Sequence, residues 1–195
     1  KAPVPTQQGP ESVADLAAGL LDAVVNISTS QKVKNDDEAP MPQVPEGSPF
    51  QDFFDEFFRE GGPRGGRNAP QRVQSLGSGF VIDAAEGVIV TNNHVIADAD
   101  DIEVNFSDGV TLKATLVGTD AKTDIAVLKI DPAGHKLTAV SFGDSDKMRI
   151  GDWVMAIGNP FGLGGTVTVG IISARNRDIN SGPYDDFIQT DAAIH

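Results

Sequence analysis

Two polar side chains lie thirty residues apart, each beside an apolar run, in positions where they could share a proton. His94 follows V-T-N-N at 90–93, and Asp124 precedes I-A-V-L-K-I at 125–130. A carboxylate bonded to an imidazole fixes its tautomer and stabilises the imidazolium that forms when the ring takes a proton. The pair could therefore be the base and orienting group of a nucleophilic relay. A lone His and a lone Asp at strand ends are also common as turn and cap residues, so spacing alone leaves both interpretations open.

The elements that must position this pair are short strand-like runs, which dominate the chain from residue 73 onward. The runs 73–83 and 87–93 flank an A-E-G turn, and I-E-V-N-F and V-T-L-K-A-T-L-V-G meet at S-D-G, a hairpin signature. Such runs, separated by Gly and Asp turns, predict an all-β barrel or sandwich. We expect His94 to end one strand and Asp124 to begin another, at a barrel rim. Further runs lie at 137–142, 153–158, 166–174 and 186–190.

A polar connector at 143–152 divides the predicted strands into two groups. About six strands precede it and only about three follow. The first unit is therefore expected to be complete and the second to be short of strands. We place the division near residue 146, with 73–146 in the first unit and 147–195 in the second.

The first 72 residues have a different character. Residues 1–10 resemble a loose arm, Ser12 is positioned to cap a short helix, and V-V-N-I-S at 24–28 predicts a first strand. Residues 31–72 hold a Pro-rich acidic run, a Phe-rich segment and a Gly-rich run, which indicates a tethered helix between linkers. That helix could pack on its own domain or dock on a neighbouring subunit or cleft, and the linkers favour docking. Its aromatic face comprises Phe50, Phe53, Phe54, Phe57 and Phe58.

Composition excludes several classes of function. The chain of 195 residues carries 15 basic and 28 acidic residues, a net charge of −13, which makes nucleic acid an unfavourable partner. It has no cysteine, so thiol catalysis and cysteine-based zinc sites are excluded. No apolar run approaches the roughly 20 residues of a membrane span, and membrane association is not indicated. The chain lacks a starting Met and a signal segment, so we expect it to be mature or trimmed.

Motifs for bound cofactors are weak. The glycine-rich L-G-S-G-F and G-N-P-F-G-L-G-G lack the G-K-[ST] of a phosphate-binding loop, and the three histidines lack H-E-x-x-H spacing. We therefore expect neither a metal nor a cofactor.

Five stretches together resemble the HtrA/Deg family of trypsin-fold serine proteases from the bacterial envelope. They are G-S-G-F-V-I-D with G-V-I-V-T-N-N-H-V-I, V-G-T-D-A-K-T-D-I-A-V-L-K-I, G-D-S-D-K-M-R-I-G-D-W-V-M-A-I-G-N-P-F-G, T-V-T-V-G-I-I-S-A and F-I-Q-T-D-A-A-I. The resemblance spans about residues 12 to 194 and implies two six-stranded β-barrels with the active site between them. It matches His94 to the general base and Asp124 to the orienting carboxylate. It also implies a periplasmic location.

The resemblance assigns regulatory roles to three other segments. Residues 31–72 match the long regulatory loop, with the Phe-rich helix as its docking element. Residues 175–186 match a sensor loop, in which Arg175 or Arg177 is expected to contact the ligand. Residues 1–30 match the segment used for trimer contacts, so a homo-oligomer of trimers or higher multiples is implied.

The resemblance also places the serine nucleophile a few residues beyond His195, where the family continues with Asn and then a Gly-Asn-Ser-Gly-Gly motif. The oxyanion hole and the peptide-binding PDZ domains would follow, so this chain alone is expected to be inactive. The pocket floor would come from Ala193 and Ile194, which favours small aliphatic side chains such as Val or Ala in the substrate. Asp191 is not expected to line it.

The leading hypothesis is an ATP-independent serine endopeptidase that degrades unfolded envelope proteins, in a protease and chaperone role. The alternative is a holdase or assembly module, in which an incomplete second barrel and the Phe-rich helix capture extended segments. A third interpretation is a non-catalytic relative with a vestigial His94–Asp124 pair.

Overall fold

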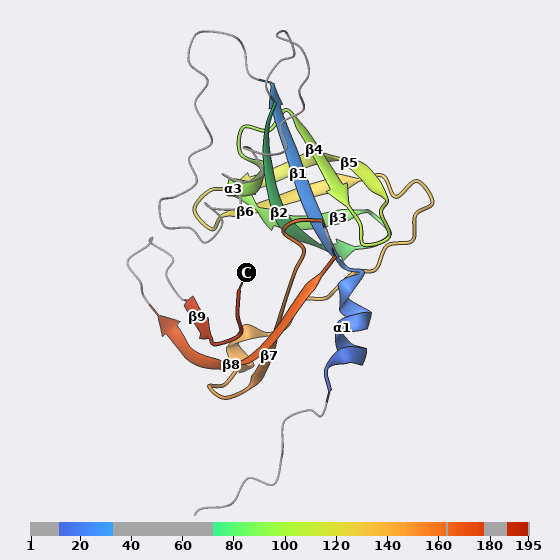
Figure 1. Ribbon diagram of the computed structural model, residues 1–195. Helices are drawn as coiled ribbons and strands as arrows, with labels where there is room; N and C mark the ends of the chain where they lie inside the picture. The colour runs from blue at the N-terminus through green and yellow to red at the C-terminus, as the bar shows by residue number, and fades with distance from the viewer. Residues whose placement is uncertain (1–11, 33–71, 163, 178–186, 195) are drawn as a thin grey trace, which may run out of the picture.

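The computed structural model describes residues 12–32, 72–162, 164–177 and 187–194. In these ranges a closed barrel of six strands is followed by a smaller three-stranded sheet, as Figure 1 shows. The all-β class, the complete first barrel and the incomplete second one are thus confirmed. The Phe-rich segment lies outside the described residues.

The barrel strands pair antiparallel in the order β1-β2-β3-β6-β5-β4. Their alternating residues face inward: in β4 the pattern D-I-E-V-N buries Ile102 and Val104 between exposed neighbours. The core includes Val25, Ile27, Val81, Ile89 and Leu128, all fully buried. The strands are β1 (Val24–Lys32), β2 (Arg72–Asp83), β3 (Val88–Asn92), β4 (Asp101–Asn105), β5 (Thr111–Asp120) and β6 (Ile125–Ile130).

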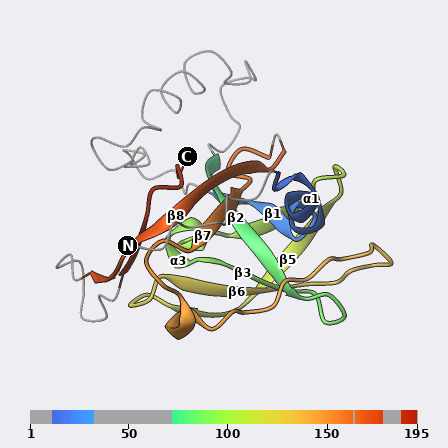
Figure 2. The same cartoon turned by 90° about the horizontal axis from the view of Figure 1, so that it is seen from below.

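The second sheet follows a polar connector that contains a short 3₁₀ turn, η1 (Ser145–Lys147). Its strands pair in the order β7-β8-β9. They are β7 (Trp153–Gly158), β8 (Thr166–Arg177) and β9 (Phe187–Thr190). The two sheets meet where β7 contacts β1, seen from below in Figure 2, and Asn26 of β1 is hydrogen-bonded to the turn that follows β7.

Two short helices complete the described part of the chain. Helix α1 (Ala14–Leu21) begins after Val13, its N-cap residue, which makes no side-chain cap bond, so the prediction of Ser12 as the cap is wrong by one residue. The Ser12 hydroxyl nevertheless accepts a hydrogen bond of 3.1 Å from the Ala14 N–H. Helix α3 (Asn93–Ile96) follows β3 directly. Neither helix combines the length and the apolar character needed to cross a membrane.

Two predicted strand boundaries are wrong. His94 does not end a strand, because β3 stops at Asn92 and the chain turns into α3. The run 137–142 is not a strand. Its Val140 N–H donates to the Val81 carbonyl at 2.9 Å, just where the pairing of β2 with β3 shifts register, so the segment covers the barrel end without joining a ladder.

Candidate active site

The structure brings His94 and Asp124 into direct contact. The Nδ1 atom of His94 lies 2.6 Å from Oδ2 of Asp124, and the His94 backbone N–H donates to Oδ1 at 2.8 Å. Both carboxylate oxygens are thereby bound to one residue, which fixes the ring orientation and leaves Nε2 as the nitrogen able to exchange a proton with a third group. The His94 side chain is 71% exposed and that of Asp124 is 41% exposed, so the pair is open to a reactant.

The Asp124 backbone makes this geometry possible. Its φ of +56° lies in the left-handed region, which Asp tolerates better than most residues. Its carbonyl accepts hydrogen bonds of 3.0 Å from the Asn93 N–H and from Nδ2 of Asn92. The turn before β6 is thus bound to the end of β3, and the side chain meets α3. Uncommon backbone geometry of this kind is concentrated at functional sites.

Asn92 was not singled out from the sequence, although it stands in the same T-N-N-H stretch. The signal available was a polar residue at the end of an apolar strand. Nothing local showed that its amide would bind a carbonyl 32 positions away along the chain.

Opposing influences set the pKa of Asp124. Partial burial is the largest of them and acts to raise the pKa, but the hydrogen bonds from the His94 backbone and ring, together with the charge of that ring, lower it below its ordinary value. The carboxylate therefore stays ionised and can stabilise an imidazolium.

The residues predicted to form the substrate pocket lie in the segment that follows β9. Ala193 is exposed and the Ile194 side chain is 75% exposed. The Ala193 carbonyl accepts a hydrogen bond of 2.6 Å from the Thr168 hydroxyl, which fixes this segment to β8. The Asp191 carboxylate accepts a hydrogen bond of 2.7 Å from the Ile171 N–H, so it is bonded to β8 of the second sheet.

Of the regulatory residues, Arg175 is described in full and Arg177 only in its backbone, while the five Phe residues lie outside the described ranges. The Arg175 guanidinium donates to three main-chain carbonyls of the connector. They are those of Ser145 at 3.2 Å, Asp146 at 3.3 Å and Met148 at 2.6 Å. Contact with a ligand remains a prediction for Arg175, and it would compete with these bonds.

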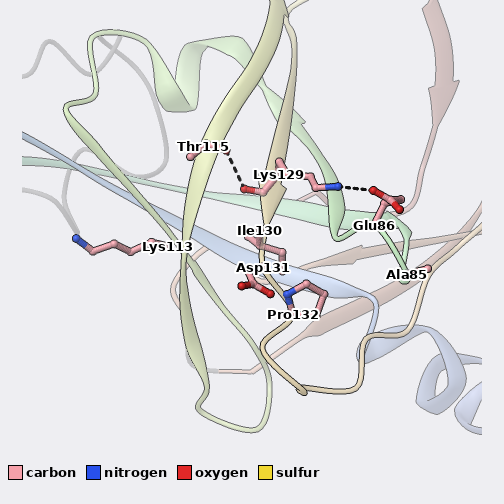
Figure 3. Close-up of a pocket in the computed structure, with 8 residues that line it drawn as sticks. All are labelled: Ala85, Glu86, Lys113, Thr115, Lys129, Ile130, Asp131 and Pro132. Atoms are coloured by element: carbon pink, nitrogen blue, oxygen red, sulfur yellow. Dashed lines mark hydrogen bonds and ion pairs between the residues drawn. The ribbon is translucent and has the colours of Figure 1, made fainter.

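The barrel carries a separate surface hollow of about 440 Å³, shown in Figure 3. It is lined by Lys113 and Lys129 among others, and Lys129 pairs with Glu86 at 2.7 Å. Lys129 and Ile130 stand at the end of β6 opposite to Asp124. The hollow is therefore distinct from the His94–Asp124 pair.

Within the described ranges, no group of three or more His, Cys, Asp or Glu side chains is arranged to hold a metal ion. No serine hydroxyl there forms a hydrogen bond with His94. The described residues thus bring together an imidazole and a carboxylate, the two groups that a base and its orienting partner require.

Comparison with known proteins identifies the family of this chain. A trypsin-like peptidase domain matches residues 77–195, which include both His94 and Asp124. The chain belongs to the trypsin-like peptidase family.

Individual relatives within the family are close. The chain is 46% identical over 210 residues to a probable periplasmic serine endoprotease, DegP-like, of Brucella melitensis, with 98% of this chain and 40% of the relative covered. It is 47% identical to a protein of the same description from Pseudomonas putida, with 97% and 40% covered. The HtrA-type protease AlgW, solved with a tripeptide, is 40% identical with a TM-score of 0.67, covering 94% of this chain and 47% of that one. The chain thus spans about 40% of the length of these curated relatives.

Proposed function

We propose that the whole protein is an ATP-independent serine endopeptidase of the periplasm that cleaves unfolded envelope proteins. The contact of 2.6 Å between His94 Nδ1 and Asp124 Oδ2 carries the proposal. The identity to DegP-like periplasmic serine endoproteases and to the HtrA-type AlgW supports it.

In this proposal a serine hydroxyl from outside the described residues attacks the scissile carbonyl carbon. His94 Nε2 takes the hydroxyl proton as the C–O bond forms, and then delivers it to the leaving amine as the C–N bond breaks. Asp124 holds the ring through Nδ1 and stabilises the imidazolium. A water molecule then attacks the acyl carbon: His94 Nε2 takes its proton as the new C–O bond forms and gives it to the serine oxygen as the ester C–O bond breaks. A chain without that serine would be inactive.

Asp124→Asn in the full-length protein tests the assignment. The amide keeps the shape of the side chain but loses the charge and one acceptor for the ring, so kcat on an unfolded reporter protein should fall by about 10⁴. Asp120→Asn is the matched control. Asp120 ends β5 four residues earlier, and its carboxylate accepts only local bonds, one of 2.9 Å from the Lys122 N–H and others from Thr123. Near wild-type turnover in folded Asp124→Asn would exclude the proposed role.

The proposal extends to specificity. Ala193 and Ile194, at the proposed pocket floor, carry no carboxylate that could pair with a basic side chain, and Oδ1 of Asp191 accepts the Ile171 N–H within the second sheet. Substrates cut after Val or Ala should therefore be preferred over substrates cut after Lys or Arg. A panel of peptides that differ only at this position measures the preference.

The regulatory assignments are also proposals. Residues 31–72 would form the regulatory loop and dock through the Phe50–Phe58 helix, with Arg175 or Arg177 reporting on ligand from 175–186. Residues 1–30 would make trimer contacts. The pairing of Lys32 with Arg72 supports a loop between the adjacent ends of two strands. Analytical ultracentrifugation of the full-length protein, with and without residues 1–11, tests the oligomer.

A second candidate function is the binding of unfolded segments without cleavage. The second sheet favours it, because apolar side chains stand exposed on its strands: Trp153 at 58%, Val169 at 37% and Ile188 at 44%. Its outer strands β7 and β9 also leave edges on which an extended segment could pair. Suppression of aggregation by the Asp124→Asn protein would support this activity, and its failure to suppress would exclude it.

A further inference from the structure

A buried asparagine of the barrel is bonded to the second sheet. Asn26 of β1 is 2% exposed, although it stands in the apolar run V-V-N-I. Its side-chain Nδ2 donates to the carbonyls of Asn159 at 3.0 Å and Pro160 at 3.1 Å, both in the turn after β7, and to that of Gly77 in β2 at 3.3 Å. One amide therefore holds main chain from both units.

The orientation of this amide is fixed from the other side. Nδ2 of Asn105 donates to Oδ1 of Asn26 at 2.9 Å, and the Thr111 hydroxyl donates to Oδ1 of Asn105 at 2.8 Å. These bonds make Oδ1 of Asn26 the acceptor and leave its NH₂ group facing the three carbonyls. A buried network with every member satisfied is rigid, because any rotation exposes unpaired groups.

A second bond holds the same turn to the neighbouring strand. The Asn159 N–H donates to the Ser78 hydroxyl at 2.9 Å. Oδ1 of Asn159 is itself buried with no hydrogen-bond partner among the described residues. The turn is therefore held by Asn26 and Ser78 from the barrel.

Gly77 and Ser78 of β2, which are bonded to Asn26 and to the turn respectively, also contact the elements that position His94. A Cβ atom at Gly77 would lie 2.6 Å from Cγ2 of Val95, so the strand and α3 are in close contact there. The Ser78 carbonyl accepts a hydrogen bond of 2.8 Å from the Thr91 hydroxyl, three residues before His94. The second sheet and the catalytic pair are thus attached to the same short piece of β2.

We propose that Asn26 is a positioning residue that sets the spacing between the His94–Asp124 pair and the second-sheet side of the active site. The inference rests on the proposed function, in which the base lies on the barrel and the group it activates comes from beyond the described residues. A base must be within about 2.6–3.2 Å of the proton it takes. An error of 1 Å in the placement of the two units would therefore break the relay even with His94 and Asp124 intact.

Asn26→Asp tests the proposal in the full-length protein. The side chain keeps its shape and the acceptor for Asn105, but it turns an oxygen toward three carbonyls in place of the NH₂ group. We expect kcat to fall by about 10², as for a misplacement of about 1 Å, while KM changes by less than about threefold. Ser78→Ala, which removes only the bond to the Asn159 N–H, should give a smaller fall in kcat.

Thr29→Val is the matched control. Thr29 is a buried polar residue of the same strand, 6% exposed, but its hydroxyl bonds only to the main chain of Ser75 at 3.3 and 3.4 Å, inside the barrel. It should lower the melting temperature without a selective loss of kcat. If Asn26→Asp and Thr29→Val lose activity only in proportion to stability, Asn26 has no positioning role.

A distance measurement separates this inference from the proposed function. Spin labels at Lys122→Cys in the barrel and Thr166→Cys in the second sheet, both exposed sites, report the spacing of the two units. The distance distribution should broaden or shift in Asn26→Asp and stay unchanged in Thr29→Val. An unchanged distribution in folded Asn26→Asp and Ser78→Ala overturns the inference. If the distribution broadens while Asp124→Asn retains full activity, the proposed function fails and the spacing role of Asn26 stands.

Discussion

Among single residues, Gly77 shows how little room surrounds the His94 helix. Any side chain there would overlap Val95, whose Cγ2 and Cγ1 atoms lie 2.6 and 2.8 Å from the position of a Cβ. Val95 is 5% exposed and β-branched, so it has few rotamers with which to yield. The helix must then move, and His94 with it.

We therefore predict that Gly77→Ala destabilises the protein by about 1–3 kcal/mol and lowers activity more than this loss of stability explains. Val95→Ala in the same chain should restore both, because it removes the two overlapping methyl groups. Gly118→Ala, in a strand position with nothing within 4 Å, serves as the control. Urea unfolding and turnover measure the effects, and additive losses in the double variant would contradict the prediction.

The ionisation of Asp124 gives a pH-dependent contribution to stability. Its pKa is lower in the folded chain than its ordinary value, so the unfolded state binds the proton more readily. The contribution is fully present above the unfolded pKa of about 3.9, and it is lost as pH falls through the folded pKa. We predict that the stability difference between wild type and Asp124→Asn shrinks as pH falls through this acidic range. Urea unfolding from about pH 4.5 to about pH 2.5 measures it, and a difference that grows over this range would contradict the sign.

The sequence allowed the two central residues to be predicted, but not how they are held. The local patterns T-N-N-H-V-I and T-D-I-A-V-L offered His94 and Asp124 as candidates, the resemblance to the HtrA/Deg family paired them, and their side chains lie in contact in the structure. Asn26 has no such local pattern: two of its carbonyl partners are 51 and 133 positions away. Its place in an apolar strand indicates a buried polar residue, and only the folded arrangement of both units shows which groups satisfy it.

At the scale of elements, the connector between the two units is held by a side chain from β8. Arg175 donates to two carbonyls within η1 and to that of Met148 just after it, the shortest bond being 2.6 Å to Met148. We predict that Arg175→Met loosens the connector at a cost of about 1–2 kcal/mol, since bonds from a charged donor are lost while the aliphatic stem remains.

Hydrogen exchange of the amides in 145–151 measures this loosening. The rate of cleavage at Asp144 or Asp146 by a protease specific for aspartate provides a second readout. Arg149→Met is the control. The Arg149 guanidinium pairs only with Asp152 on the surface, at 2.8 Å, and its side chain is 82% exposed, so little stability should be lost. Equal exchange in both variants would show that Arg175 does not hold the connector.

The alternation of apolar and polar residues predicted the barrel strands well, because successive residues of a strand face opposite sides of the sheet and only one side is buried. In β6 the run I-A-V-L-K-I buries Ala126, Leu128 and Ile130, every second residue. The run 137–142 has similar composition, yet it lies outside the ladders because all six barrel strands already pair with one another. A local pattern cannot show that the sheet has closed without it.

At the scale of the whole molecule, the two units differ in how completely they bury their strands. The barrel is closed, and its core cluster has thirteen buried side chains. In the described part of the second sheet only Ile172 and Ala174 of the strands belong to the buried apolar set, and β7 and β9 are edges. Closed sheets lose amide protection only through global opening, whereas edge strands also open locally.

We therefore predict that amide exchange in this 195-residue chain separates the two units. The amides of Ile27, Ile89 and Leu128 should exchange slowest, at the rate set by global unfolding. Those of β7 and β9 should exchange faster and depend less on denaturant, because their opening exposes little surface. Leu128→Ala, which should cost about 2–5 kcal/mol, would accelerate the barrel amides and leave the β7 and β9 amides nearly unchanged. Equal protection and equal response in both units would instead mean that the bonds of Asn26 and Ser78 join them into one cooperative structure.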